Sequence, residues 1–434
     1  MHAEFCTGRR AALWAGVALA AVGAAGTAQA SGYALLEQSA EFQGASYAGS
    51  AARADDPSTL FYNPAGMTQL PGYQFSISGA LILPQSNLHS GRATTAAGTP
   101  ASGTVGIDAG ENVLLPSFYA TAEIAPDWHL GLGVTSPFGL GTKYDPASIA
   151  RYDALTTSLI TTDITPSLAW QPLPVLSVAA GVRVEIANAR LSQAVDFGSA
   201  GYRYRVPGYL PGQNDGISAM KGGDAAVGWQ LGLLLQPVPG TTVGFDYRSP
   251  IFHKLSGSIA FQNAGPLAPL FPGGNASARL VTPDTFSLSA TQDLGPFTLL
   301  AGIDYTLWSR FKDLQINYTG GPATITENWH DTVMLSAGAD WHVLPGLTLR
   351  SGAAFDRTPA SDSNRNALIP DANRYWLSVG ATFRPLPVLA LSAAYSHLFV
   401  DGSKINTTTT TGSLLQASYN NQINILSAQA TLSF

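Results

Sequence analysis

The side chains that most often carry acid–base, nucleophilic or metal chemistry are few and scattered in this chain. The histidines past residue 30 show no H-x-x-x-H or H-E-x-x-H zinc spacing; they are His89, His129, His253, His330, His342 and His397. The single cysteine is Cys6. A G-x-S-x-G nucleophile elbow and a phosphate-binding glycine loop are also missing. The sequence therefore predicts no enzyme, no metal site and no cofactor.

The first thirty residues predict an export signal. Arg9 and Arg10 precede an apolar run over residues 11–26, and Ala28-Gln29-Ala30 has the small residues of a cleavage site. This order of basic, apolar and small residues is typical of a secretory signal peptide. We expect residues 1–30 to be removed, which also removes Cys6 and with it any disulfide or thiol chemistry.

Composition predicts a membrane protein built from strands. Charged residues make up 12% of the chain, against roughly 25% in ordinary globular proteins. Beyond residue 30 there is no run of 18 apolar residues, which a membrane helix would need. A barrel strand needs only one apolar face. The net charge of −6 argues against a nucleic-acid partner, which usually binds a basic surface.

Apolar and polar residues alternate along several segments, with the period of two that strands require. At the C-terminus one face carries Leu426, Ala428, Ala430 and Leu432, and the other carries Ser427, Gln429, Thr431 and Ser433. Residues 297–307 and 377–383 repeat the pattern. A soluble sandwich could also alternate, but the export signal, the low charge and the terminal Phe434 favour a barrel.

Six short turns punctuate these segments, each with a proline that ends a ladder: residues 125–128, 171–174, 236–240, 293–296, 343–346 and 384–387. Reading strands on either side predicts an all-β fold, a fourteen-stranded antiparallel transmembrane barrel over residues 71–434. The expected strands are 73–84, 113–124, 128–139, 157–170, 174–193, 225–236, 241–254, 280–292, 296–308, 331–343, 346–357, 374–384, 387–400 and 422–434. The long connections lie opposite the turns, so both termini are expected in the periplasm.

Residues 31–70 lack strand alternation and are predicted to form a plug inside the barrel. The run DDPSTLFYNPAGM, from Asp55 to Met67, is rich in turn residues. Asn63 can accept turn hydrogen bonds, Pro64 fixes φ, and Gly66 permits a tight reversal. Aromatic residues in this segment offer surface to pack, unlike a disordered tail. A free periplasmic tail is the alternative.

The segment GYALLEQSAEFQGASYAGSAARADDPSTLFYNPAGM resembles the N-terminal hatch of the FadL-type outer-membrane transporters of long-chain fatty acids and hydrocarbons (OmpP1/FadL/TodX). The stretches SPFGLGTKYD, FDYRSPIFHKLSG and YTLWSRF are similar too, as is the run from Leu347 to Phe383. The likeness spans the mature chain with its motifs in order. It implies the same fold, a fourteen-stranded barrel plugged by the hatch.

The resemblance implies a path for an apolar ligand. In the family, the ligand is caught by the third and fourth long loops, passes to a lumenal pocket closed by the hatch, and leaves sideways at a kink of the third strand. Here the fourth loop offers Leu267, Leu270 and Phe271, although packing of loop against loop explains these residues equally well. The kink maps to Pro137, Phe138 and Gly139, where a strand-end turn is the plainer alternative.

The resemblance also implies a carboxylate site. In fatty-acid members the hatch asparagine, a serine and basic residues meet the ligand carboxylate. Asn63, followed by Pro64 and Ala65, matches the hatch signature, and Ser136 matches the serine.

The basic positions depart from the family pattern. They align near Gln193 and Ile325, which are uncharged, while Arg190 is close by. A buried carboxylate needs a cationic partner, so fatty acid and neutral hydrocarbon both remain open.

Further ionisable residues match family positions on the wall, where such groups normally face the lumen and pair. We expect a structural charge network of Arg248, Asp331, Arg350, Asp356 and Arg374. The expected protein is a monomer in the bacterial outer membrane that contacts its lipid and takes up hydrophobic small molecules, namely fatty acids, hydrocarbons or detergents. A general or substrate-selective diffusion porin is the alternative.

Overall fold

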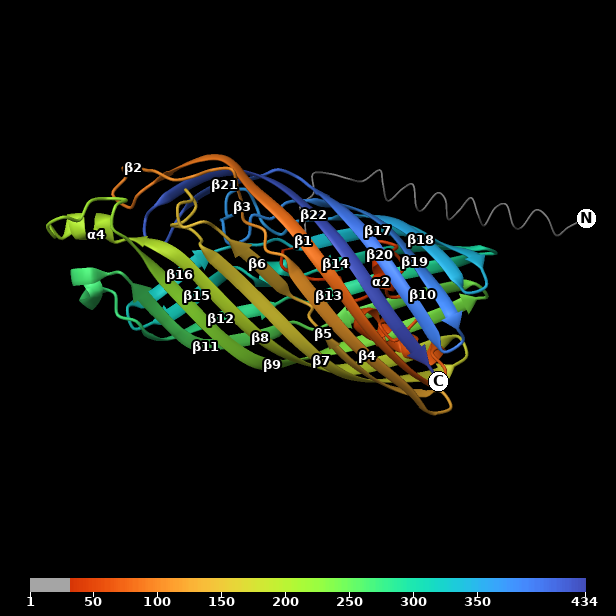
Figure 1. Ribbon diagram of the computed structural model, residues 1–434. Helices are drawn as coiled ribbons and strands as arrows, with labels where there is room; N and C mark the ends of the chain where they lie inside the picture. The colour runs from red at the N-terminus through yellow and green to blue at the C-terminus, as the bar shows by residue number, and fades with distance from the viewer. Residues whose placement is uncertain (1–31) are drawn as a thin grey trace, which may run out of the picture.

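The structure, a computed structural model, describes residues 32–434 and consists of one closed barrel with a folded segment inside it (Figure 1). The expected signal peptide and its cleavage site lie outside the described residues. Within residues 32–434, no helix is both long enough and apolar enough to cross a membrane.

Fourteen wall strands, three of them interrupted, pair antiparallel with their neighbours in chain order. They are β1 Tyr73–Thr94, β4 Val113–Ala125, β5 Trp128–Thr135 with β6 Gly139–Lys143, β7 Thr156–Leu173, β8 Leu176–Asp196, β9 Asp215–Val238, β10 Thr241–Arg248 with β11 Ile251–Gln262, β12 Gly274–Thr282 with β13 Thr285–Leu294, β14 Phe297–Thr306, β17 Thr332–Leu344, β18 Leu347–Asp356, β19 Arg374–Leu386, β20 Leu389–Val400 and β22 Leu414–Ser433. The last strand pairs with the first over most of its length, from Gln74–Ser433 to Thr94–Leu414. The predicted fourteen-stranded antiparallel barrel is confirmed.

Shorter elements decorate the end of the barrel opposite the C-terminus (Figure 1). They are β2 Pro100–Ala101, β3 Ile107–Asp108, α4 Phe197–Arg203, η2 Gly265–Leu270, η3 Trp308–Arg310, the hairpin of β15 Asp313–Tyr318 with β16 Gly321–Thr326, and β21 Ser403–Thr408. This end is called the loop end below.

All six proline-marked turns join wall strands where the sequence predicts them. Several strands are longer than predicted at the loop end: β1, for example, extends to Thr94 and β22 begins at Leu414. The reason is physical. Apolar alternation is required only where a strand faces lipid, so a strand that continues into water keeps its ladder but loses its sequence signal.

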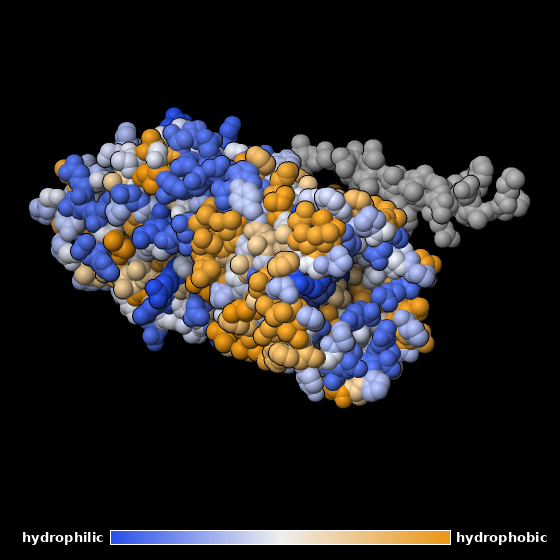
Figure 2. Space-filling model, turned by 45° about the vertical axis from the view of Figure 1, so that its right-hand side comes forward, coloured by the Kyte–Doolittle hydropathy of each residue, from blue (hydrophilic) through white to orange (hydrophobic). Residues whose placement is uncertain are grey.

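Large apolar side chains are exposed around the middle of the barrel, as a lipid-facing surface requires. Figure 2 shows them as an orange band, with hydrophilic blue residues over the loop end. Examples on neighbouring strands are Leu130, Leu168, Val182 and Leu231. The band contrasts with the lumen side of the same strands, where Ser167 and Gln230 are buried.

Residues 32–70, called the hatch below, lie inside the barrel near the end that holds the short turns (Figure 1). The hatch contains α2 Ala40–Gln43, α3 Thr59–Tyr62 and η1 Pro64–Gln69, whose residues are mostly buried. The hatch backbone contacts the wall strands at glycine positions, where no side chain intervenes. A Cβ on Gly244 or Gly352 would lie within 3 Å of the carbonyl oxygen of Ala51 or Ala45, closer than Cβ atoms come in practice. The wall glycines therefore set how closely the hatch docks.

Replacing Gly244 with alanine is expected to displace the hatch, because the added methyl group meets a backbone oxygen that cannot rotate away. An overpacking cost of about 1–3 kcal/mol would raise the population of the undocked state by about 5- to 160-fold. Trypsin cleavage after the buried Arg53 and single-channel conductance both report undocking. Gly79→Ala, whose methyl group would meet only the Leu114 side chain at 3.9 Å, is the control. Equal cleavage and conductance in the two variants would contradict backbone docking.

Candidate functional site: an apolar cavity beside an interrupted strand

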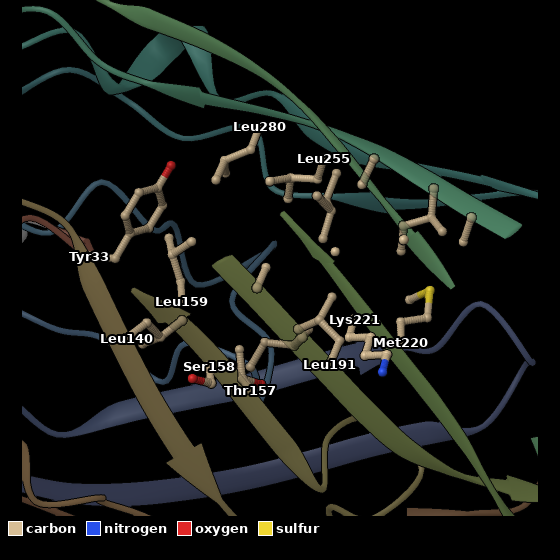
Figure 3. Close-up of a pocket in the computed structure, with 18 of the residues that line it drawn as sticks. Tyr33, Leu140, Thr157, Ser158, Leu159, Leu191, Met220, Lys221, Leu255 and Leu280 are labelled. Carbon is tan, nitrogen blue, oxygen red and sulfur yellow. The ribbon is translucent and has the colours of Figure 1, made fainter. Parts of the chain in front are cut away.

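An apolar cavity lies between the top of the hatch and the loop-end part of the wall. Its empty volume is about 790 Å³, open solvent included. Strands β6 to β9, β11, β12 and β15 contribute to its lining, together with Tyr33 of the hatch. Figure 3 shows leucines from several strands converging on the space. The principal lining side chains are Leu159, Leu191, Met220, Leu255, Leu280 and Phe311.

Strand alternation makes this lining apolar although cations stand on the same strands. Successive strand residues point to opposite faces, and each exposed cation is the immediate neighbour of a lining residue. The pairs are Arg190 with Leu191 on β8, Lys221 with Met220 on β9, Lys254 with Leu255 on β11, and Arg279 with Leu280 on β12. Lys221 borders the cavity, but in Figure 3 its nitrogen points opposite to the Met220 sulfur.

Glu327 is the one carboxylate among the lining residues within the described chain. It lies at the loop end, between β16 and β17, and its side chain is buried. Its Oε1 accepts a hydrogen bond from Asn366 Nδ2 at 2.9 Å, and its Oε2 accepts one from Trp329 Nε1 at 3.0 Å. Burial raises the pKa of Glu327 to about 7, an effect opposed by these two bonds and reinforced by nearby Asp153.

Tyr33 forms the boundary between the cavity and the hatch. Its ring packs edge-on against Trp308 with centroids 4.7 Å apart, and against Phe138 at 5.9 Å. Its hydroxyl donates to the backbone oxygen of Val281 at 3.1 Å. Edge-to-face aromatic pairs of this kind favour one fixed arrangement. The cavity floor is therefore a defined aromatic surface that contacts the third strand.

The third wall strand is interrupted beside this floor. The ladder between β4 and β5 ends at the Phe118–Val134 pair, while β6 resumes at Gly139 and pairs with β7. The hatch bonds to the break instead: Leu35 N donates to Pro137 O at 2.8 Å, and Gly139 N donates to Tyr33 O at 2.9 Å. Hatch backbone thus takes hydrogen bonds that a neighbouring strand normally provides.

Gln38 of the hatch bridges β4 and the break. Its Oε1 accepts from Ser117 Oγ at 2.8 Å and from Ser136 N at 3.1 Å, and its Nε2 donates to Ser136 O at 2.8 Å. One buried side chain therefore joins two strands whose own ladder has ended.

The predicted hatch residues lie away from the cavity and hold the hatch together. Asn63 Oδ1 accepts from Ala65 N at 3.0 Å and so caps η1, which begins at Pro64. Its Nδ2 donates to Ala51 O at 2.6 Å and Leu233 O at 3.0 Å. All polar atoms of this amide are thus bonded within the protein. Ligand contact by Asn63, Pro64 or Ala65 stays a prediction for another state.

Arg190, the basic residue close to the positions that carry cations in the family, does not face the cavity in this structure. It is exposed on the outer face of β8, opposite the face that bears Leu191. The reason is strand parity: Leu191, and not Arg190, points the same way as the buried Arg183 and Glu185. Gln193 is half-buried and, like Ser136, is not among the cavity-lining residues.

The three loop residues have different environments. Leu267 is buried in a small core with Val195 and Phe197, so loop packing explains it. Phe271 packs edge-on against Phe197, with centroids 4.8 Å apart. Leu270 is 52% exposed, which leaves it available to an apolar molecule arriving from outside.

The predicted charge network is present in part, with partners that the sequence did not reveal. Arg248 Nη2 bonds Asp163 at 3.1 Å, and Arg350 forms ion pairs with Asp340 at 3.3 Å and with hatch Glu41.

The other three residues of the predicted network, Arg374, Asp356 and Asp331, lie in different surroundings. Arg374 pairs with Asp371 at 2.9 Å, and Asp356 is buried. Asp331 is the exception, because it accepts from the exposed Tyr305 hydroxyl at 3.2 Å and lies outside the lumen. A charged residue at a position that matches the family therefore does not by itself show which face of the wall its side chain occupies.

Raised pKa values predict that the loop end becomes less stable as pH rises. Burial raises the pKa of Glu327 to about 7, so folding favours its protonated form. The resulting stabilisation is complete below the unfolded pKa of about 4.3 and is lost as pH rises through about 7. Between pH 4 and pH 8, the wild type should lose about 3–4 kcal/mol relative to Glu327→Gln. Guanidinium unfolding in detergent tests this, and parallel pH profiles would contradict it.

Removing Arg350 is expected to destabilise hatch docking strongly, because Glu41 and Asp340 are buried beside it. An uncompensated buried charge costs about 3–5 kcal/mol. Arg350→Met should therefore lower the free energy of unfolding by that amount, and adding Glu41→Gln should recover part of it. Arg92→Met, at an exposed arginine that bonds only Gln416, should change it by less than about 0.5 kcal/mol. A small effect at Arg350 would show that these pairs do not anchor the hatch.

Comparison with known proteins supports one family over the whole chain. The model of the family described as outer membrane protein transport protein (OMPP1/FadL/TodX) matches residues 21–434. An outer membrane protein of Neisseria meningitidis is 28% identical over 449 residues, covering 95% of this chain and 96% of that protein. The long-chain fatty acid transport protein of Escherichia coli K12 is 26% identical over 407 residues, covering 87% of this chain and 90% of that protein.

Solved structures of members of this family have the same fold as the present barrel. The crystal structure of a Pseudomonas aeruginosa FadL homologue matches with a TM-score of 0.87 at 26% identity, covering 93% of this chain and all of that one. The Pseudomonas putida toluene transporter TodX shares the fold, with a TM-score of 0.69 at 15% identity and coverage of 93% and 99%. Because the family model spans nearly the whole sequence and the barrel matches its members, the chain belongs to the OMPP1/FadL/TodX family of outer-membrane transport proteins.

Proposed function

We propose that this protein mediates passive uptake of hydrophobic molecules, long-chain fatty acids or related hydrocarbons, across the outer membrane. The printed names of its relatives support this class of cargo: a long-chain fatty acid transport protein in Escherichia coli and a toluene transporter in Pseudomonas putida. The proposed route runs from the loop end into the cavity and then sideways through the wall at the third strand.

The observation that carries the proposal is the apolar cavity directly beside the interrupted strand. Leu140 of β6 and Tyr33 of the hatch both line the cavity, and Tyr33 also bonds Gly139 at the break. A molecule held there would lie next to the break in the third strand. Water would be a poor exit for it, since each Å² of exposed apolar surface costs about 25 cal/mol.

Each step has residues suited to it. Leu270 and Tyr204 are exposed on neighbouring loops at the entrance and would collect an apolar molecule. Gln38 and the backbone of Leu35 hold the hatch to the third strand, so a hatch shift would free this edge. Pro137, Phe138 and Gly139 form the break through which the cargo would leave.

A diffusion porin is the alternative, and it requires a continuous water path along the barrel axis. The hatch occupies the lumen and touches the wall at Gly244 and Gly352 without intervening side chains. Buried ion pairs, such as Arg53 with Asp340 at 3.1 Å, fix it there. This packing favours a lateral exit.

Closing the break chemically tests the lateral route. Ser117 and Ser136 lie on either side of it and bond the same Gln38 oxygen. Because the only cysteine is Cys6, a Ser117→Cys/Ser136→Cys pair can be joined selectively with a short bifunctional thiol reagent. We expect cross-linking to abolish uptake of a hydrophobic tracer into vesicles, and each single variant treated alike to retain it.

Unchanged uptake after complete cross-linking would contradict lateral release and favour an axial path. The double variant without the reagent controls for the substitutions themselves. A shift in gel mobility on heating checks that the barrel is intact.

A further inference from the structure

We propose, on the basis of the uptake function above, that the cavity selects uncharged cargo and that Glu327 acts as the specificity residue that disfavours ionised carboxylates. The accepted molecules would be hydrocarbons, esters and alcohols, with an acid entering only in its protonated form. The proposal names the class of cargo, which the family resemblance left open.

The first support is the orientation of the cations around the cavity. An ionised carboxylate transferred to an apolar site requires a cation or several hydrogen-bond donors. On β8, β9, β11 and β12, the cations adjacent to lining residues are exposed on the outer face. Moving one of them inward would need a one-residue register shift, which would turn every side chain of that strand to the wrong face.

The second support is the position and bonding of Glu327. Both of its oxygens accept from neutral donors, Asn366 and Trp329, so the carboxylate is held in place. Among the described residues, no cation forms an ion pair with it. At a pH above about 7, where Glu327 is ionised, an ionised ligand in the same cavity would meet a like charge in a poorly solvated space, where charge repulsion is strong.

The third support is how few polar groups remain to bind a ligand. The Tyr33 hydroxyl is already bonded to Val281 O. The hydroxyl of Thr157, a lining residue, is buried and has no hydrogen-bond partner. One hydroxyl donor can bond an ester, an alcohol or a protonated acid, but it does not neutralise a charge. Ser158 and Ser277 also border the cavity, but each is the neighbour of inward-facing residues on its strand. Thr157 is thus the buried hydroxyl of the lining that would bond a neutral polar group.

The test compares a long-chain fatty acid with its methyl ester, which have nearly the same shape and differ in charge. Binding to the purified full-length protein in lipid nanodiscs at pH 8 can be followed by tryptophan fluorescence, since Trp308 and Trp329 pack against Tyr33 at the cavity floor. We expect the wild type to bind the ester at least about tenfold more tightly. Acid binding that equals or exceeds ester binding would overturn the proposal.

Two variants assign the selectivity to this cavity. Glu327→Gln removes the negative charge and should narrow the ester-to-acid ratio by at least about threefold. Met220→Lys combined with Glu327→Gln places an ammonium on an unbranched side chain that points into the cavity, and should reverse the preference. Met220→Leu is the matched apolar control and should keep the wild-type ratio.

The outcomes separate this proposal from the uptake function on which it rests. If the ratio is the same in the wild type and in both charge variants, selectivity does not come from Glu327 and the proposal fails, although uptake can stand. If neither ligand binds the wild type or the Met220→Leu control, the cavity is not the cargo site and the uptake proposal loses its main support.

Discussion

The structure depends on one constraint: within hydrocarbon, every backbone N–H and C=O must find a partner inside the protein. Fourteen wall strands satisfy it by closing on each other, with β22 bonded to β1. At the third strand the wall alone does not satisfy it, because the β4–β5 ladder stops at Phe118–Val134. Hatch atoms supply the missing partners. The wall is therefore complete in its backbone hydrogen bonds only when the hatch is folded inside it.

The lumen is mostly polar, yet it contains an apolar cavity. Near the short turns, the inward faces carry serine, threonine and the partners of ion pairs that anchor the hatch, such as Asp340 with hatch Arg53. Toward the loop end the inward faces become leucine, and the cations move to the outward faces. The same period of two serves both regions. A change in which residue types occupy the inward positions is enough to convert a water-compatible wall into an apolar cavity.

Much of the architecture follows from the sequence, for identifiable reasons. Proline-containing turns and lipid-facing alternation are local signals, and both located the wall strands. The interruptions were harder to read: the predicted strand over residues 241–254 breaks at Ser249 and Pro250 between β10 and β11. A proline occurs both in loops and at interruptions of strands, so the sequence alone does not show whether the strand ends there or resumes after the proline.

The site was less predictable than the fold because it depends on which face points inward. Arg190 and Leu191 are adjacent in sequence, yet only the leucine lines the cavity. A count of parity from Arg183, a charged residue at lipid depth that must face the lumen, would have identified Leu191. Nothing local identifies Glu327 as a cavity residue, because one of its two hydrogen-bond donors, Asn366, lies on a distant part of the chain, although the other, Trp329, is a near neighbour in sequence. Likewise, the side chain of Gln38 bonds Ser117 and Ser136, which are distant in sequence.

If cargo leaves through the third strand, a molecule in the cavity is expected to loosen the bonds between the hatch and this strand. Hydrogen–deuterium exchange of the Leu35 and Gly139 amides, which bond Pro137 O and Tyr33 O across this contact, measures it directly. With a saturating neutral hydrocarbon, the account predicts faster exchange at these two amides and unchanged exchange at Val134, which lies within the β5 ladder. Unchanged or slower exchange at Leu35 and Gly139 in the loaded protein would contradict it.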